Sequence, residues 1–477
     1  MKLPHLAGVA AAALLAGSAA AADVDATKKS EPQAPAPTFW DSVTITGAAD
    51  AGVTVNFADP YNKLNFGRLF DDRANWPTFN QAFLNIQKPL DPKATGYDFG
   101  FRVVGIIGED VRYTHYLGEL DYAIHSRTQL GPLEAHALAH LPWVTPFSEG
   151  GFDLKVGQFV TPLGAEVITA PDNPFYSHTY IFNTGPFQHT GVLATDHVNS
   201  WLDVFAGVTT GENTSIGWPG DNQNSPSLLA GFAINLLDGK LLINGGTHAG
   251  PENPKQLDPY LVGWPTGVVG GIPVACGCNP TDTWRFLNDV NVTWKATDKL
   301  TLILDSAYYR DNGWDPISIT GLSAGALNVF SAATGVNTGL IPVRSQGVSA
   351  YGAAGYALYQ LDDIFKLGAR LEIFRDNNNF FVAGFPGYFD AVNVQHGFAA
   401  PSVIVAGPSN RGTTYFSLTT GVTITPELPK NNWVKNVILR PEVRWDTTMN
   451  GMAPFAGGTK RSTVTFGLDA IIPFTLK

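Results

Sequence analysis

FDLKVGQFVTPLGAEVITAPDNPFYSHTYIFNTGPFQHTGVLATDHV, residues 152–198, contains two strand-like segments joined by a long loop. Four prolines between residues 161 and 188 exclude a long helix there and remove donors from any β-ladder. The same loop carries large apolar side chains, which are costly to leave in water: Phe175, Tyr176, Tyr180, Ile181, Phe182 and Phe187. We therefore expect the loop to dock inside a cavity or against a neighbouring surface.

Short motifs follow one another through this region, and two more lie upstream. They are LKVGQFV (154–160), TPLG (161–164), EVI (166–168), APDNP (170–174), YS (176–177), GPF (185–187) and TGV (190–192), with NQAFLN (80–85) and RYTH (112–115) upstream. Over residues 79–211 the chain resembles the OmpL-like putative beta-barrel porin family of bacterial outer membranes. The resemblance implies an outer-membrane barrel whose third long loop, residues 161–188, folds inward as a constriction.

The N-terminus has the order of a secretory signal: a basic residue, an apolar run over residues 6–16 and small residues up to Ala22. We expect cleavage after Ala22, followed by a Pro/Ala-rich periplasmic tail over residues 23–42. Beyond residue 22 no window approaches the roughly 18 consecutive apolar residues that a spanning helix requires. Membrane embedding would therefore require a closed β-barrel, here residues 43–477, although the composition also allows a large soluble β protein.

The formal net charge of −11 argues against nucleic-acid binding, which favours basic patches. The chain has two cysteines, Cys276 and Cys278, separated by one glycine. Two thiols alone make a poor metal site, so we expect them to be structural or incidental.

Apolar and polar residues alternate along many segments, as in strands with two different faces. In residues 437–446, four charged side chains share one face: Arg440, Glu442, Arg444 and Asp446. A sandwich core could not bury four charges on one strand at low cost, so these side chains face either outer water or a wet lumen. Pro441 interrupts the same strand and is expected to mark a bulge or to lie near the rim.

The alternation predicts sixteen strands. Their ranges are 43–57, 79–88, 96–107, 133–143, 152–160, 189–198, 201–210, 227–236, 240–250, 283–295, 299–310, 346–359, 363–376, 413–425, 434–447 and 461–474. The connectors between them alternate between long and short, which is the layout of bacterial outer-membrane barrels with short periplasmic turns and long extracellular loops. Sixteen strands about 4.8 Å apart and tilted about 40° enclose a cylinder roughly 30 Å across, so the lumen must be wet or plugged. The sequence thus predicts an all-β, closed antiparallel transmembrane barrel.

Two sets of side chains are expected to contact solutes. In the loop they are Glu166, Asp172, Asn173, Tyr176, Ser177, His178 and Tyr180. On the inner strand faces they are Arg102, Glu134, His136, His140, Arg285, Asp289, Arg370, Glu372, Arg440, Glu442 and Arg444. The charged ladder on the last strands would either set a transverse field or only keep the lumen hydrated.

Motifs for chemistry carry little weight in this chain. The pattern GLSAG at 321–325 matches a serine-hydrolase motif, but it lies in a small-residue loop and not on a strand–turn–helix elbow. Glu134, His136 and His140 share one strand face, but side chains four apart on a strand are roughly 13 Å apart, beyond the reach of one ion. We expect no catalytic residues, no metal and no cofactor.

The leading hypothesis is an outer-membrane porin for passive diffusion of small hydrophilic solutes or ions. The alternatives are a non-conducting barrel, either an adhesin or an enzyme, and a soluble periplasmic protein that binds carbohydrate. Expected partners are outer-membrane lipid, lipopolysaccharide, the barrel-assembly machinery and the solutes, while homo-oligomerisation stays open. Conductance separates the first two hypotheses, and cell fractionation separates both from the third.

Overall fold

The computed structural model describes residues 39–92, 94–116, 119–120, 127–216, 225–252, 268–269, 272–273, 284–312, 347–379, 381–382, 412–426, 428, 433–434 and 436–477. The expected signal peptide, residues 23–38 of the tail, Cys276, Cys278 and the motif at 321–325 lie outside these residues. Among the residues that are described, no helix is both long enough and apolar enough to cross a membrane.

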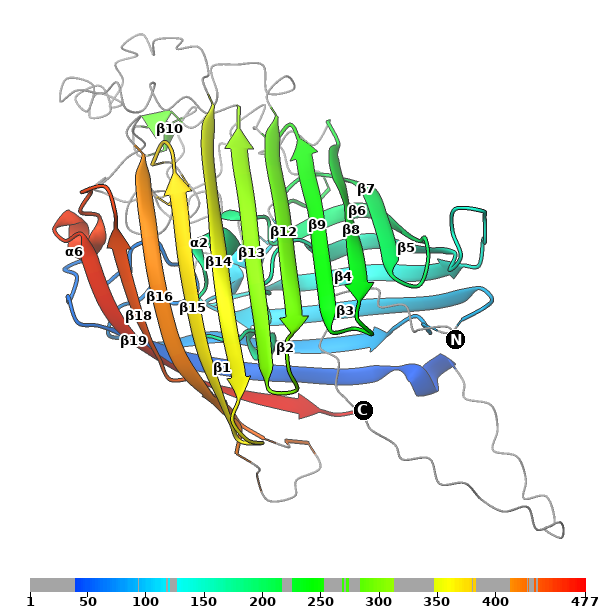
Figure 1. The fold of residues 1–477 in the computed structure, drawn as a ribbon, viewed down its shortest axis with the longest axis horizontal. Coiled ribbons are helices and arrows are strands. Elements are labelled where there is room, and N and C mark those ends of the chain that lie inside the picture. The colour runs from blue at the N-terminus through cyan, green and yellow to red at the C-terminus, as the bar shows by residue number, and fades with distance from the viewer. Residues whose placement is uncertain are drawn as a thin grey trace.

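Seventeen strands form one closed antiparallel sheet, in which β1 pairs with both β2 and β19 (Figure 1). They are β1 (Thr44–Asn56), β2 (Pro77–Lys88), β3 (Asp98–Gly108), β4 (Gln129–Leu141), β5 (Phe152–Val160), β6 (Gln188–His197), β7 (Leu202–Thr209), β8 (Ser227–Leu236), β9 (Leu241–Gly250), β12 (Arg285–Lys295), β13 (Leu300–Asp311), β14 (Val348–Gln360), β15 (Phe365–Asp376), β16 (Thr413–Ile424), β17 (Ile438–Leu439), β18 (Glu442–Thr448) and β19 (Ser462–Thr475). A separate two-stranded ladder joins β10 (Val268–Val269) to β11 (Ile272–Pro273).

β17 and β18 form one crossing of the sheet that is interrupted at Arg440 and Pro441, because proline cannot donate to the ladder. Counting them together gives the sixteen crossings that the sequence predicted, and the closed antiparallel barrel is confirmed. The connector at 425–437 is as long as the one at 449–461, so the separation of loop lengths fails at this one position.

The fourth crossing differs most from its prediction. β4 begins at Gln129, four residues earlier than the predicted start at residue 133. The register against β3 jumps from Val104↔Glu134 to Gly105↔Pro132, which leaves Leu133 as the extra residue of a bulge. Leu133 is therefore buried on the inside of the barrel, although strict alternation predicted that it would point outward.

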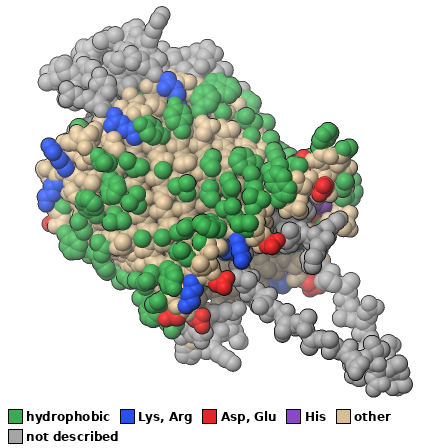
Figure 2. Space-filling model, viewed as in Figure 1, with side chains coloured by type: hydrophobic (Ala, Val, Ile, Leu, Met, Phe, Trp, Pro, Cys, Tyr) green, Lys and Arg blue, Asp and Glu red, His purple; other side chains and the backbone are tan. Residues whose placement is uncertain are grey.

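The outside of the barrel is apolar, and Lys, Arg, Asp and Glu gather near its ends (Figure 2). Exposed aliphatic side chains lie along the strands: Leu84, Val103, Val192, Val208, Leu228, Val290, Leu304, Leu371, Leu418, Val443 and Leu468. Exposed aromatic side chains lie toward the short turns (Trp201, Trp294, Tyr359) and toward the long loops (Trp284, Tyr308, Tyr351, Trp445). An apolar band between two aromatic girdles is the surface that a lipid bilayer requires.

The inside of the barrel is packed by three of the long loops. They contain α1 (Val111–Thr114), the 3₁₀ turn η2 (Ala170–Asp172) and α2 (Tyr180–Thr184). Phe70 packs against His178, Phe182 and Phe187, with ring centroids 4.8, 5.4 and 5.7 Å apart. These loops and the inner strand faces share one apolar core inside the barrel.

Candidate functional site

The loop at 161–187 lies across the interior of the barrel, and in Figure 1 α2 lies behind β13 and β14, within the ring of strands. The backbone N–H of Gly164 donates to Asp289 of β12 at 2.9 Å. The hydroxyl of Tyr309, on β13, donates to the carbonyl of Ile181 at 2.7 Å. The loop begins after β5, and both contacts are made to strands that lie far from β5 around the sheet.

Glu166 is the most heavily bonded polar side chain of the loop. It accepts hydrogen bonds from Arg370 at 2.7 Å and from Tyr356 at 2.9 Å, and its second oxygen accepts from the backbone N–H of Thr179 at 3.0 Å. Burial alone would raise the pKa of Glu166, but the charge of Arg370 and the hydrogen bonds from His178 and Thr179 outweigh it and lower that pKa to about 2. The carboxylate therefore stays ionised at neutral pH.

Two strand carboxylates bind backbone N–H groups of the loop. Glu372, on β15, accepts from Tyr180 and Ile181 at 3.0 and 3.1 Å, at the start of α2. Glu442, on β18, accepts from Tyr176 and Ser177 at 2.9 and 3.2 Å. Each carboxylate satisfies two N–H groups that would otherwise be buried without a partner.

Strand arginines bind the loop's carbonyl groups. Arg440 donates to Ala170 and Asn173 at 2.8 and 2.7 Å, and Arg444 donates to the carbonyl of His178. Arg370 donates to the carbonyl of Ser177 at 2.6 Å. We call the inner surface formed by Arg370, Glu372, Arg440, Glu442 and Arg444 the covered wall, because the loop covers it.

The two preceding loops add ion pairs to this arrangement. Arg68 bonds Asp71 at 2.6 Å and Asp446 of β18 at 2.8 Å. Asp72 accepts from Arg112 and Arg127. Burial by itself would raise the pKa of Asp72, but the two arginines outweigh it and hold that pKa below its ordinary value.

A small cavity remains where the three loops meet strands β1 and β2. It measures about 10 Å³, with room for roughly one water molecule. Its lining includes Asp110, whose carboxylate accepts from Gln81 at 2.8 Å. Burial raises the pKa of Asp110 to about 7, although Gln81, Asn80 and Arg112 act in the opposite direction.

The predicted solute contacts of the loop are mostly buried. Glu166, Asn173, Tyr176, Ser177, His178 and Tyr180 are all buried, with their polar atoms bonded to strand residues or to the loop itself. Asp172 is exposed. These residues lie in the loop, but the sequence did not show that most of them are buried and bonded to protein groups.

The predicted residues of the strand faces divide into two groups. Those of the covered wall are buried, and the side chains of Arg370, Arg440 and Arg444 are 0%, 4% and 1% exposed. Asp289 is buried as well and accepts from the loop. Arg102 and Arg285, by contrast, remain 29% and 26% exposed. Glu134, His136 and His140, which were also expected to line the lumen, are buried.

Arg102 belongs to the second inner surface, formed by the inner faces of β3–β7. It contacts Glu134 at 3.2 Å, and further along the same surface His140 contacts Asp153 at 2.7 Å. Lys155 and Asp203 are also only partly buried there. We call the surface formed by Arg102, Glu134, His136, His140, Asp153, Lys155 and Asp203 the open wall.

Several residues that bind the loop were not predicted. They are Gln81, Asp305, Tyr309 and Tyr356 on the strands. Arg68, in the first long loop, was not predicted either, and it binds Asp446 of β18. The alternation of β13 and β14 places Asp305, Tyr309 and Tyr356 on the inner face, so strand alternation was the available signal. For Arg68 the sequence carried no such signal.

Comparison with known proteins gives one match over most of the chain. The model of a family described as "Putative beta-barrel porin-2, OmpL-like" matches residues 42–474. The comparison with curated proteins found no match.

Among solved structures, an anion-selective porin from Comamonas acidovorans gives a TM-score of 0.50 at 9% identity, covering 91% of this chain and 99% of that one. The outer-membrane channel DcaP of Acinetobacter baumannii gives 0.44 at 11% identity, covering 91% and 97%. OmpT of Vibrio cholerae gives 0.45 at 10% identity, covering 90% and 97%. The likeness to the Comamonas porin concerns the fold alone.

Proposed function

The chain belongs to the putative beta-barrel porin-2, OmpL-like family, which makes it a porin of the bacterial outer membrane, and from this we propose how solutes cross it. Small hydrophilic solutes pass along the open wall, and the loop at 161–187 narrows that path. Passage is passive diffusion and needs neither a cofactor nor catalysis by the protein. The hypothesis of a soluble periplasmic carbohydrate-binding protein is excluded by this membership and by the apolar outer band.

The observation that carries this proposal is the unequal exposure of the inner arginines. On the covered wall, Arg370 and Arg444 are bonded to the loop and shielded from water. On the open wall, Arg102 keeps part of its guanidinium accessible. Ions and polar solutes respond to side chains that they can approach, so the path follows the open wall.

The loop narrows the path because it fills the opposite side of the barrel. Between Gly164 and Ile181, its backbone and side chains are bonded to strands β12, β13, β15 and β18. A barrel of sixteen crossings is too wide for strand side chains alone to fill, so an ordered loop inside it sets the narrowest section.

The outer surface supports the remaining partners that we propose. The apolar band between aromatic girdles would contact outer-membrane lipid, and the long loops would lie at the level of lipopolysaccharide. Insertion of such a barrel would require the barrel-assembly machinery. A homo-oligomer is compatible with this surface.

Single-channel conductance in planar bilayers tests the proposal. Replacing residues 172–182 with a Gly/Ser linker of equal length removes η2 and α2 contacts, and the assembled variant is expected to conduct more than the wild type. A matched control removes the exposed ion pair of Asp59 and Lys63 by changing both residues to Ser, and it should leave conductance unchanged.

Heat-modifiable migration on a denaturing gel would establish that each variant has formed a barrel. No conductance from the assembled wild type would support the non-conducting alternative, an adhesin or an enzyme. Equal conductance of the wild type and the linker variant would place the narrowest section elsewhere and refute the role of the loop.

A further inference from the structure

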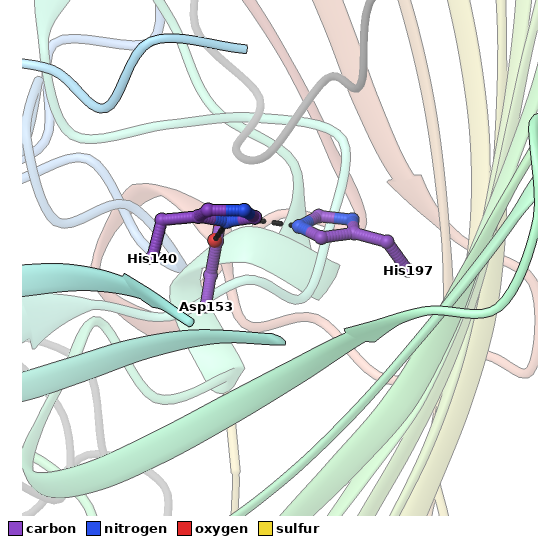
Figure 3. Close-up of side chains that lie close together, drawn as sticks. All are labelled: His140, Asp153 and His197. Atoms are coloured by element: carbon purple, nitrogen blue, oxygen red, sulfur yellow. Dashed lines mark hydrogen bonds and ion pairs between the residues drawn. The ribbon is translucent and has the colours of Figure 1, made fainter. Parts of the chain in front are cut away.

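Three side chains from three neighbouring strands converge on the open wall near the short turns (Figure 3). Nδ1 of His140, on β4, lies 2.7 Å from one carboxylate oxygen of Asp153, on β5. Nε2 of His197, on β6, lies 3.1 Å from the other carboxylate oxygen. One ligand atom of each residue lies within 4.8 Å of those of the other two.

Strand register brings this cluster together. His140 and Asp153 are direct cross-strand partners, and so are His197 and Asp203. Side chains of directly opposed residues start about 4.5–5.5 Å apart, so both pairs must meet if they share a face. The carboxylate oxygen Oδ1 of Asp203 lies 2.8 Å from Nδ1 of His197.

We propose that His140, Asp153 and His197 bind a divalent first-row transition metal ion, Zn²⁺ in the first instance. Two imidazoles and one carboxylate are ligands that Zn²⁺ prefers, whereas Ca²⁺ and Mg²⁺ take oxygen ligands. Tetrahedral Zn²⁺ with bonds of about 2.0 Å holds its ligand atoms roughly 3.3 Å apart, so small side-chain rotations suffice.

Asp203 acts on the metal through His197. A metal-binding histidine commonly donates its other ring N–H to a carboxylate, which fixes the tautomer and the orientation of the ring. In this chain Nδ1 of His197 would donate to Asp203, leaving Nε2 for the metal beside Asp153. The geometry therefore contains both the ligands and the group that orients one of them.

The charge of the cluster favours a cation. Asp153 and Asp203 bring two carboxylates together, and the ion pairs that Asp153 makes in the described residues are with His140 and His197. A divalent ion would neutralise both carboxylates and let the two imidazoles stay uncharged. Without a metal, the same cluster needs a protonated imidazole, which is the competing explanation.

The sequence alone does not reveal this cluster. Glu134 and His136 lie on the same strand as His140 but too far along it to share one ion with it. The partners that reach His140 come from neighbouring strands, and their register was not known. A bound ion would link β4, β5 and β6 at the short-turn end of the open wall, with its fourth position directed toward the lumen.

Metal binding to the full chain, purified in detergent without a polyhistidine tag, tests the proposal. After treatment with a chelator and its removal, equilibrium dialysis against Zn²⁺ should give one ion per chain. Co²⁺ should compete with Zn²⁺ and show the visible absorption bands of a four-coordinate site. His140→Ala and His197→Ala should each abolish this stoichiometric binding and the Co²⁺ bands.

Two further variants separate a built site from general affinity for histidine. Asp203→Asn should keep the stoichiometry but weaken affinity about 10- to 100-fold, as expected for loss of the orienting carboxylate. His136→Ala, on the same strand and face as His140, should leave binding unchanged. Heat-modifiable migration shows that each variant has assembled.

The proposal is overturned if the assembled wild type binds no Zn²⁺ stoichiometrically, which leaves the protonated-imidazole explanation. It is equally overturned if both single histidine variants retain the ion, or if His136→Ala loses it to the same extent.

Discussion

The covered wall and the open wall carry the same kinds of residue, but those residues have different partners. Both present basic and acidic side chains on the inner faces of their strands. On the covered wall these groups bind a loop that lies more than a hundred residues away in the sequence. On the open wall they bind side chains of adjacent strands, and Arg102 and Asp153 stay partly exposed while Glu134 is buried.

This difference shows that strand alternation reveals which face a charge occupies but not whether water reaches it. A charged inner face can hydrate a lumen, or it can anchor a loop through many charge-assisted hydrogen bonds. In this barrel the two uses lie on opposite parts of one inner surface. The following predictions test that division, beginning with the largest expected effect.

Removal of one arginine from each wall should have unequal effects on stability. Arg370→Met leaves Glu166 buried without its ion-pair partner, which should cost about 3–5 kcal/mol of the free energy of unfolding. Arg102→Met should cost less, because Arg102 is partly exposed and the buried Glu134 keeps His136 nearby. Urea unfolding of the assembled proteins measures both, and equal losses would show that the walls do not differ.

The pH dependence of stability should show that the loops packed inside the barrel shield Asp110 from bulk water. The pKa of Asp110 is about 7 in the folded chain, above its ordinary value, because the group is buried. At Asp110 the folded protein then binds more protons than the unfolded chain between about pH 4 and 7, so the contribution of Asp110 to stability is full below that window and falls as the pH rises through it. Asp110→Asn should reduce the slope of the free energy of unfolding against pH by at most about 1.4 kcal/mol per pH unit.

Urea unfolding near pH 5 and pH 7 measures this slope. Glu166→Gln is the control, because the pKa of Glu166 is about 2 and its contribution is lost only as the pH falls below about 4.5 toward 2. That variant should be less stable than the wild type but should keep the slope between pH 5 and 7. A slope that Asp110→Asn leaves unchanged would mean that bulk water reaches Asp110.

Much of this fold could be predicted from the sequence, because barrel strands must alternate between lipid and lumen. The bulge at Leu133 could not, since it depends on the register between β3 and β4. The apolar composition of residues 161–188 suggested a surface to pack on. The pairing of Glu166 with Arg370 could not be read, because nothing local connects positions so far apart. The convergence of His140, Asp153 and His197 was hidden for the same reason.

Ion selectivity should respond to a charge on the open wall and not to one on the covered wall. Arg102→Gln should shift the reversal potential toward cations, because a partly exposed charge is removed beside the path. An interaction of about 1 kcal/mol at 4 Å in water limits the change in permeability ratio to about five-fold. Glu372 was expected from the sequence to line the lumen, but it is buried under α2. Glu372→Gln should therefore leave the reversal potential unchanged in protein that assembles.

The smallest effect is expected within the loop itself, at Asp172. This carboxylate is exposed and accepts a hydrogen bond from the hydroxyl of Thr169 at 2.7 Å. Asp172→Asn should change the free energy of unfolding by no more than about 0.5 kcal/mol, as surface substitutions usually do. It should shift the reversal potential slightly toward anions, and less than Arg102→Gln shifts it toward cations.

The adjacent Asn173 provides the contrast, because its buried amide donates to the carbonyl of Val167 and accepts from the N–H of Val167. Asn173→Asp places a carboxylate against that carbonyl and should cost about 1–3 kcal/mol. If Asp172→Asn proved the more damaging of the two, the loop would be docked with its other face toward the wall.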